Sequence, residues 1–208
     1  MIAILDYGVG NLFSLRCSLE KIGAAVKVTS DLAEIREADK LILPGVGAFG
    51  DAAKKLRDSG LDVLIKEQAA LGKPLLGICL GMQLLFEKSY EYGEHEGLGL
   101  LKGTVVGMEG QLPAQLLIPH IGWNSLKITD STCPLFRTIS DGDCVYFVHS
   151  YFAVDCEESL AATTEYGLEL TAAVAKQNIF GCQFHPEKSG EVGLKILRAF
   201  CEMEVPRP

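Results

Sequence analysis

A single cysteine lies between two glycines where an apolar segment meets a helical pattern, in Gly77-Ile78-Cys79-Leu80-Gly81. This is the Gly-x-nucleophile-x-Gly form of a nucleophile elbow, with cysteine in the serine position. So sharp a turn leaves no room for side chains two residues before and after the nucleophile. The helix dipole would favour the thiolate, and the first free N–H group, that of Leu80, can stabilise an oxyanion. The alternative is a small buried cysteine whose glycines only permit close packing.

A histidine and a glutamate follow another apolar segment, in Phe184-His185-Pro186-Glu187. If this segment stays extended, the side chains of His185 and Glu187 project from the same side. The carboxylate can then fix the imidazole tautomer and stabilise the imidazolium that forms when the ring takes a thiol proton. Alone, the pair is typical of a surface ion pair. Together with the elbow it predicts a catalytic triad, because the ends of parallel strands meet at one edge of a sheet.

The elements that must position these residues alternate along the first half of the chain. Buried strands are predicted at 2–5, 26–29, 41–43 and 74–78, and helices at 12–22, 56–70 and 80–88. After about residue 95, glycine-punctuated stretches predict an antiparallel or mixed extension, with strands at 144–154, 171–175 and 179–184 and a closing helix at 191–203. The predicted fold class is α/β, a largely parallel open sheet flanked by helices with an antiparallel extension, in a single domain of residues 1–208.

The composition narrows the classes of function. The 208 residues carry a net charge of -8 without a long run of like charges, so no nucleic-acid partner is expected. The chain lacks both the apolar run of roughly 20 residues that a membrane helix needs and a basic leader, which predicts a cytoplasmic protein without a membrane partner. Seven cysteines without a Cys-x-x-Cys pair favour reduced thiols over disulfides or a metal site.

Glycines after the first strand, in Asp6-Tyr7-Gly8-Val9-Gly10-Asn11, raise the possibility of a dinucleotide site. The Gly-x-Gly-x-x-Gly fingerprint would require a third glycine where Phe13 stands. We therefore expect no dinucleotide, and no other cofactor is indicated.

Both chemical motifs resemble those of the class I, triad-type glutamine amidotransferases, and the resemblance extends over essentially the whole chain. Further stretches resemble the glutaminase subunits of imidazole glycerol phosphate synthase, an enzyme of histidine biosynthesis; they are residues 6–11, 44–47, 119–124 and 147–151. The resemblance implies that Cys79 attacks the side-chain amide of glutamine and forms a thioester. Ammonia would leave with a proton from His185, and water would then release glutamate.

The resemblance also implies roles for residues around the triad. Backbone N–H groups near Val46 and of Leu80 would hold the oxyanion, and the glycines beside Val46 would allow that loop to change conformation. A simple glycine turn leaving the sheet is the alternative for this loop, and a packed or partner-facing role is the alternative for His149. The residues expected to bind glutamine are Gly45, Gly47, Gln83, Glu91, His149, Ser150 and Tyr151.

Ammonia released into water at neutral pH becomes ammonium, so a useful glutaminase must deliver it to a synthase along a protected path. The resemblance implies a separate (β/α)₈-barrel cyclase subunit as heterodimer partner, which would make imidazole glycerol phosphate and aminoimidazole carboxamide ribotide. Nucleotide on that partner is expected to raise glutaminase activity. The residues expected at the interface are Pro119, Ile121, Trp123, Asn124, Tyr146 and Lys188.

Three other functions remain open from the residues alone. The glutaminase of another synthase, such as that of pyridoxal phosphate synthesis, is disfavoured by the Tyr7 motif and the loop at 44–47. A cysteine peptidase or stress-type protein of related fold is disfavoured by Gln83 and the His185 motif. A binding subunit without chemistry is disfavoured by the intact triad.

Overall fold

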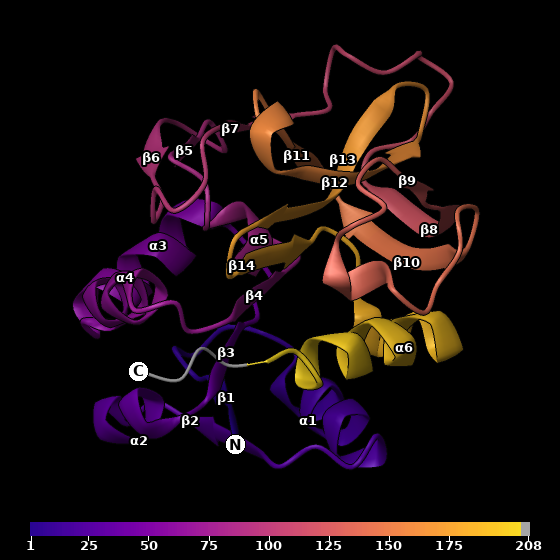
Figure 1. The fold of residues 1–208 in the computed structure, drawn as a ribbon. Coiled ribbons are helices and arrows are strands. Elements are labelled where there is room, and N and C mark those ends of the chain that lie inside the picture. The colour runs from indigo at the N-terminus through magenta and orange to yellow at the C-terminus, as the bar shows by residue number, and fades with distance from the viewer. Residues whose placement is uncertain (205–208) are drawn as a thin grey trace.

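The computed structural model describes residues 1–204 and is built around an eight-stranded sheet in the order β2-β1-β3-β4-β14-β13-β12-β9 (Figure 1). The first five strands in this order are parallel: β2 (Val26–Thr29), β1 (Ile2–Leu5), β3 (Lys40–Leu43), β4 (Leu75–Ile78) and β14 (Ile179–Cys182). The remaining three continue the sheet antiparallel: β13 (Glu169–Lys176), β12 (Leu160–Glu165) and β9 (Lys127–Ile128). The predicted fold class is confirmed.

Helices cover both faces of the parallel strands, as their continuous apolar sequences require. Successive side chains of β1 alternate between two cores, with Ala3 and Leu5 in one and Ile2 and Ile4 in the other. The first core is closed by α2 (Leu32–Glu37), α3 (Phe49–Asp58) and α4 (Leu61–Ala70). The second is closed by α1 (Leu12–Lys21) and α6 (Gly190–Cys201), which lie side by side on the opposite face (Figure 1).

Two smaller sheets flank this framework. One pairs β8 (His120–Ser125) with β10 (Cys144–His149). The other has the order β11-β7-β5-β6 and contains β11 (Tyr151–Val154), β7 (Thr104–Gly107), β5 (Lys88–Ser89) and β6 (His95–Glu96). Short 3₁₀ helices are η1 (Pro134–Phe136), η2 (Glu157–Ser159) and η3 (Pro186–Lys188).

Three predicted elements divide or end well short of their predicted bounds, whereas the bounds of the others agree to within about two residues. The helix predicted at 56–70 is two helices, because Gly60 adopts the left-handed conformation with a φ of 71° between α3 and α4. The strand predicted at 144–154 divides at Ser150 into β10 and β11, which belong to different sheets.

The helix predicted at 80–88 is also shorter than expected, since α5 covers only Leu80–Gln83. The carbonyl groups of Leu84 and Leu85 accept hydrogen bonds from the N–H groups of Leu98 and Leu100, at 2.8 and 2.9 Å. These distant donors take the acceptors that a longer helix would have used for its own next turn.

Candidate active site

Cys79 forms the turn between β4 and α5, with φ 54° and ψ -113°. Such a backbone conformation is strained for any residue other than glycine and persists only where the surrounding structure enforces it. A Cβ atom on Gly81 would lie 1.8 Å from the carbonyl oxygen of Leu43, and one on Gly77 would lie 2.6 Å from the carbonyl oxygen of Gly81. The prediction that both flanking glycines are sterically required is confirmed.

The order of the strands brings His185 to the same cavity as Cys79. Strands β4 and β14 are parallel neighbours, and the N–H of Cys79 donates to the carbonyl of Cys182 at 2.7 Å. His185 follows β14 by three residues, and its own N–H donates to the carbonyl of Tyr146 at 2.9 Å. Two segments that are far apart in the sequence therefore end at one edge of the sheet.

The imidazole of His185 is oriented by Glu187, whose Oε1 lies 2.8 Å from Nδ1 of the ring. Both side chains are almost fully buried. The expectation that this segment is extended is wrong, because Pro186 begins η3 and the N–H of Lys188 donates to the carbonyl of His185 at 3.0 Å. The tight turn of η3 nevertheless places the Glu187 carboxylate next to the imidazole of His185.

The electrostatic setting of His185 favours its protonated form. Burial alone lowers the pKa of His185, but the nearby Cys79 sulfur and the Glu187 carboxylate outweigh that effect and raise the pKa to about 9. Within residues 1–204, Nε2 of His185 has no hydrogen bond of good geometry. That nitrogen is free to exchange a proton with a group in the cavity that His185 and Cys79 both line.

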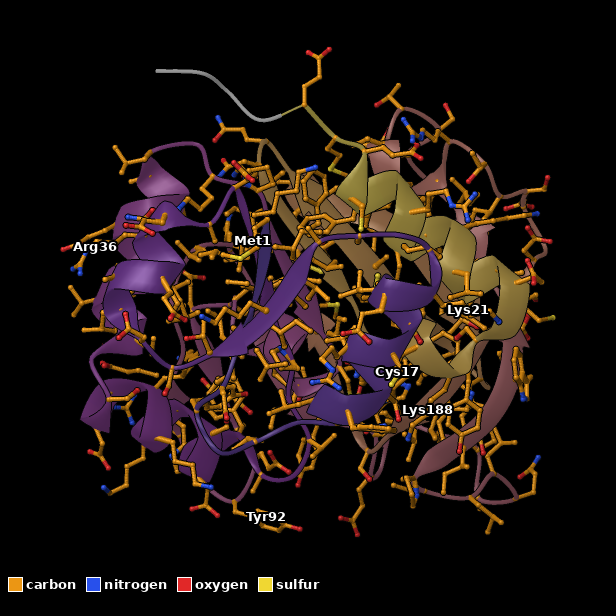
Figure 2. The ribbon with its side chains drawn as sticks, turned by 90° about the horizontal axis from the view of Figure 1, so that it is seen from below. Met1, Cys17, Lys21, Arg36, Tyr92 and Lys188 are labelled. Carbon is orange, nitrogen blue, oxygen red and sulfur yellow. The ribbon has the colours of Figure 1, made fainter. Side chains whose placement is uncertain are left out.

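This cavity has a volume of about 560 Å³ and gathers most of the residues predicted around the triad. Its walls contain Val46, Gly47, Cys79, Leu80, Gln83, Glu91, His149, Ser150, Tyr151 and His185, together with Pro119 and Lys188 from the predicted interface. Tyr92, also in its lining, projects outward at the rim (Figure 2). The other predicted residues lie outside this lining; they are Gly45, Ile121, Trp123, Asn124, Tyr146 and Glu187.

Gly45 does not line the cavity, but its loop packs directly against the turn that contains Cys79. A Cβ atom on Gly45 would lie 2.8 Å from the backbone nitrogen of Gly81. The same loop is held by Tyr7, whose buried hydroxyl donates to the carbonyl of Pro44 at 2.6 Å. Burial raises the pKa of Tyr7, so the hydroxyl remains a donor. At the other end of the loop, Gly47 has a φ of 93° that suits glycine.

The predicted glutamine-binding side chains are largely engaged by the protein itself. Glu91 accepts a hydrogen bond from the N–H of Phe49 at 2.6 Å, and burial raises the pKa of Glu91 despite that bond. The ring of His149 contacts the carbonyl of Tyr151 at 2.9 Å and Nδ1 of His120 at 3.1 Å. Burial, the largest effect, lowers the pKa of His149 to about 3, so the ring is neutral at physiological pH.

Sequence reasoning assigned no role to Gln183, although it lies in the motif that contains His185. Its side chain is fully buried, with Nε2 at 3.7 Å from Sγ of Cys79 and Oε1 at 2.9 Å from Nε2 of Gln83. A polar residue directly after an entirely apolar strand is the signal that marks it.

The predicted interface residues outside the cavity lie on β8 and β10. Trp123 and Ile121 are 56% and 58% exposed, and the ring of Tyr146 lies 6.1 Å from that of Trp123. Nζ of Lys188 stands 5.9 Å from the centre of the Tyr146 ring. Asn124 differs, since its amide donates to the carbonyl of Glu165 at 2.8 Å.

Two kinds of feature are not found in the part of the chain that the structure describes. Among residues 1–204, no three histidine, cysteine, aspartate or glutamate side chains are grouped so that they could hold a metal ion. In the same range, no helix combines the length and the apolar character needed to cross a membrane.

Comparison with known proteins places the chain in a family. The family model described as glutamine amidotransferase class-I matches residues 3–203. A protein of Caldanaerobacter subterraneus subsp. tengcongensis named imidazole glycerol phosphate synthase subunit HisH is 55% identical over 98% of both chains. A protein of the same name from Oceanobacillus iheyensis is 50% identical over 98% of this chain and 99% of its own.

Solved structures agree in fold at much lower identity. A crystal structure described as a glutamine amidotransferase superposes with a TM-score of 0.75 at 20% identity and covers 97% of both chains. The PurLQS structure from Thermotoga maritima gives a TM-score of 0.72 at 22% identity and covers 96% of both chains. Since the family model spans nearly the whole chain and the HisH relatives match it from end to end, this chain belongs to the class I glutamine amidotransferases and, among them, to the HisH subunits of imidazole glycerol phosphate synthase.

Proposed function

We propose that this chain hydrolyses glutamine to glutamate and ammonia and passes the ammonia to a (β/α)₈-barrel cyclase subunit in the cytoplasm. The observation that carries the proposal is the meeting of a strained cysteine turn and a buried histidine with a raised pKa in one cavity. Such an arrangement prepares a thiolate and an imidazolium before substrate arrives.

In the first half of the reaction, Sγ of Cys79 attacks the side-chain carbonyl carbon of glutamine. The carbonyl oxygen becomes an oxyanion, which the N–H of Leu80 and a backbone N–H near Val46 would stabilise. The C–N bond then breaks, and His185 gives its Nε2 proton to the departing ammonia. The carboxylate of Glu187, 2.8 Å from the ring, keeps the imidazole in the orientation that this transfer needs.

In the second half, His185 takes a proton from water as the water oxygen attacks the thioester carbon. The C–S bond breaks, glutamate leaves, and the Cys79 sulfur is restored. Glu91, a carboxylate in the cavity wall, would receive the amino group of glutamine. The positive charge of that group would favour the ionised carboxylate and so oppose the effect of burial, which raises the pKa of Glu91.

The cyclase partner would dock on the exposed surface of β8 and β10 next to the cavity. Exposed aromatic and aliphatic side chains there, Trp123 and Ile121, are suited to become the buried centre of an interface. Lys188 and Pro119 line the cavity and lie in the same region as Trp123 and Tyr146. Ammonia released at Cys79 would then have a short path to the partner that avoids bulk water.

The chemistry is tested by glutamate release and by covalent labelling with a diazoketone analogue of glutamine. Replacement Cys79→Ala is expected to abolish both signals. The matched control is Cys144→Ala, which removes an exposed cysteine on β10 and is expected to leave both unchanged. Glutamate release that persists in the Cys79→Ala variant would contradict the proposal.

The partner is tested by adding the candidate cyclase subunit with its nucleotide to the purified chain. We expect glutamate release to rise in the complex, and we expect Trp123→Ala to weaken binding roughly tenfold or more. Leu71→Ala is the matched control, because Leu71 is an exposed apolar residue at the end of α4, outside the proposed surface. Equal binding by the wild-type, Trp123→Ala and Leu71→Ala proteins would remove the support for this docking surface.

A further inference from the structure

A buried row of hydrogen bonds leads from β11 to the sulfur of Cys79. Nε2 of Gln83 donates a hydrogen bond to the carbonyl of Tyr151 at 3.1 Å and another to Oε1 of Gln183 at 2.9 Å. Nε2 of Gln183 in turn lies 3.7 Å from Sγ of Cys79. Both glutamine side chains are buried, so each amide depends on protein partners.

The carbonyl of Tyr151 determines the orientation of both glutamine amides. A backbone carbonyl can only accept, so the carbonyl of Tyr151 requires the NH₂ group of Gln83. That NH₂ group also faces Gln183, which must present its oxygen in return. The NH₂ group of Gln183 is consequently directed at the Cys79 sulfur. Reversing the Gln83 amide would set its oxygen against the carbonyl oxygen of Tyr151, and reversing the Gln183 amide would set its NH₂ group against that of Gln83.

His149 also contacts the carbonyl of Tyr151, which is the first group in this row of hydrogen bonds. Its Nδ1 lies 2.9 Å from the carbonyl of Tyr151 and must donate to it, so Nε2 of His149 accepts from Nδ1 of His120 at 3.1 Å. The carbonyl of Tyr151 thus holds two donors, Gln83 and His149, and remains fixed as an acceptor.

We propose that Gln183 is a further catalytic residue, whose amide donates a hydrogen bond to the Cys79 sulfur and favours the thiolate for attack on glutamine. This role rests on the glutaminase function proposed above. Unlike His185, an amide does not exchange its proton in the reaction, so its effect is electrostatic and present throughout the cycle. A donor directed at sulfur stabilises the charged form over the neutral thiol.

One contact acts in the opposite sense. The carbonyl of Val148 lies 4.0 Å from Sγ of Cys79 and can accept only from the protonated thiol. The Gln183 amide is nearer, at 3.7 Å, and can donate only to sulfur lone pairs. His185 and Tyr7 both interact electrostatically with Cys79, and both stay unchanged in the variants below. The other ionisable side chains that line the same cavity also stay unchanged; they include Glu91, Glu109, His149 and Lys188.

The test is the pH profile of Cys79 alkylation by iodoacetamide, followed by mass spectrometry of the peptide that contains Cys79. Gln183→Leu keeps the approximate size of the side chain and removes the donor. We expect the midpoint of its profile to rise by about one pH unit and the rate at neutral pH to fall roughly tenfold. Gln68→Leu is the matched control, because it removes another buried glutamine, on α4, and is expected to leave the midpoint unchanged.

A second variant guards against a folding defect in the first. Gln83→Leu leaves Gln183 in place but removes the group that orients its amide, so we expect a smaller rise of the midpoint in the same direction. Circular dichroism would establish that each variant is folded. A wild-type midpoint in either folded variant would overturn the proposal, since donor and orientation are both required.

Kinetics with glutamine separate this role from simple packing. Gln183→Leu is expected to lower kcat roughly tenfold and to leave KM within about twofold, because the donor acts on the reacting sulfur. A raised KM with an unchanged kcat would overturn the proposal. The two proposals can fail separately, because alkylation requires no glutamine. A wild-type protein without glutaminase activity would contradict the proposed function. The alkylation profiles would still decide whether Gln183 favours the thiolate.

Discussion

His185 holds its proton more tightly than an ordinary histidine, and this links the charge in the cavity to the stability of the fold. The pKa of His185 is raised from 6.5 to about 9 by Cys79 and Glu187, against the effect of burial. The folded protein therefore binds this proton more tightly than the unfolded chain. The resulting stabilisation is complete below pH 6.5 and is lost as the pH rises through about 9.

We therefore predict a pH-dependent difference between the wild-type protein and the His185→Gln variant. The free energy of unfolding of the wild type relative to the variant should decrease between pH 6.5 and 9. Urea unfolding at several pH values across this window measures it. A difference that stays constant across the window would show that His185 is not protonated in the folded state at neutral pH.

A second prediction at the residue scale concerns Tyr7. Tyr7→Phe leaves the carbonyl of Pro44 without the buried donor at 2.6 Å, so the free energy of unfolding should fall by about 1 kcal/mol. The rate of glutamate release should fall as well, because the loop that carries Val46 loses its anchor. Tyr90→Phe, at a half-exposed tyrosine outside the cavity lining, is the control and should change neither quantity.

At the scale of elements, the junction of β4 and α5 tolerates no side chain at its glycines. In Gly81→Ala the new methyl group would meet the carbonyl oxygen of Leu43 at 1.8 Å, and backbone cannot move aside as a side chain can. We predict a loss of about 1–3 kcal/mol in the free energy of unfolding, measured in urea. Gly107→Ala is the control, since its methyl would make an ordinary contact of 3.4 Å with the Tyr151 ring.

Local patterns were sufficient for the elbow because its requirements are local: a strand, a nucleophile and two glycines within five residues. They were insufficient for the end of α5, where the run of Leu84, Leu85 and Phe86 suits a helix equally well. Only the distant residues Leu98 and Leu100 decide that outcome, through their hydrogen bonds to this run. The extended conformation predicted after His185 was wrong for a local reason, since Pro186 also suits the first position of a 3₁₀ turn.

The candidate site shows the same division. The grouping of Cys79, His185 and Glu187 and much of the surrounding cavity could be predicted because the proposed chemistry restricts the residue types to a few. The row through Gln83 and Gln183 could not, because these residues are 100 positions apart and nothing in the sequence states which amide faces which. Their relation depends on β4 and β14 being neighbours in the sheet.

At the scale of the whole molecule, the central sheet passes without interruption from its parallel to its antiparallel part. We predict that residues 1–208 behave as one domain and unfold in a single cooperative transition. Far-ultraviolet circular dichroism and the fluorescence of Trp123, on β8, should give coincident urea unfolding curves. Separate midpoints for the two signals would divide the chain into units that unfold independently.

The pairing of β4 with β14 also sets when the enzyme can first act during its synthesis. Cys79 and Gln183 are 104 residues apart, and His185 comes later still. A nascent chain on the ribosome carries the cysteine long before the histidine that would activate it has been translated. If Cys79 and His185 act as proposed, a chain that ends before β14 should release no ammonia, because this strand must insert between β4 and β13 before the two residues meet.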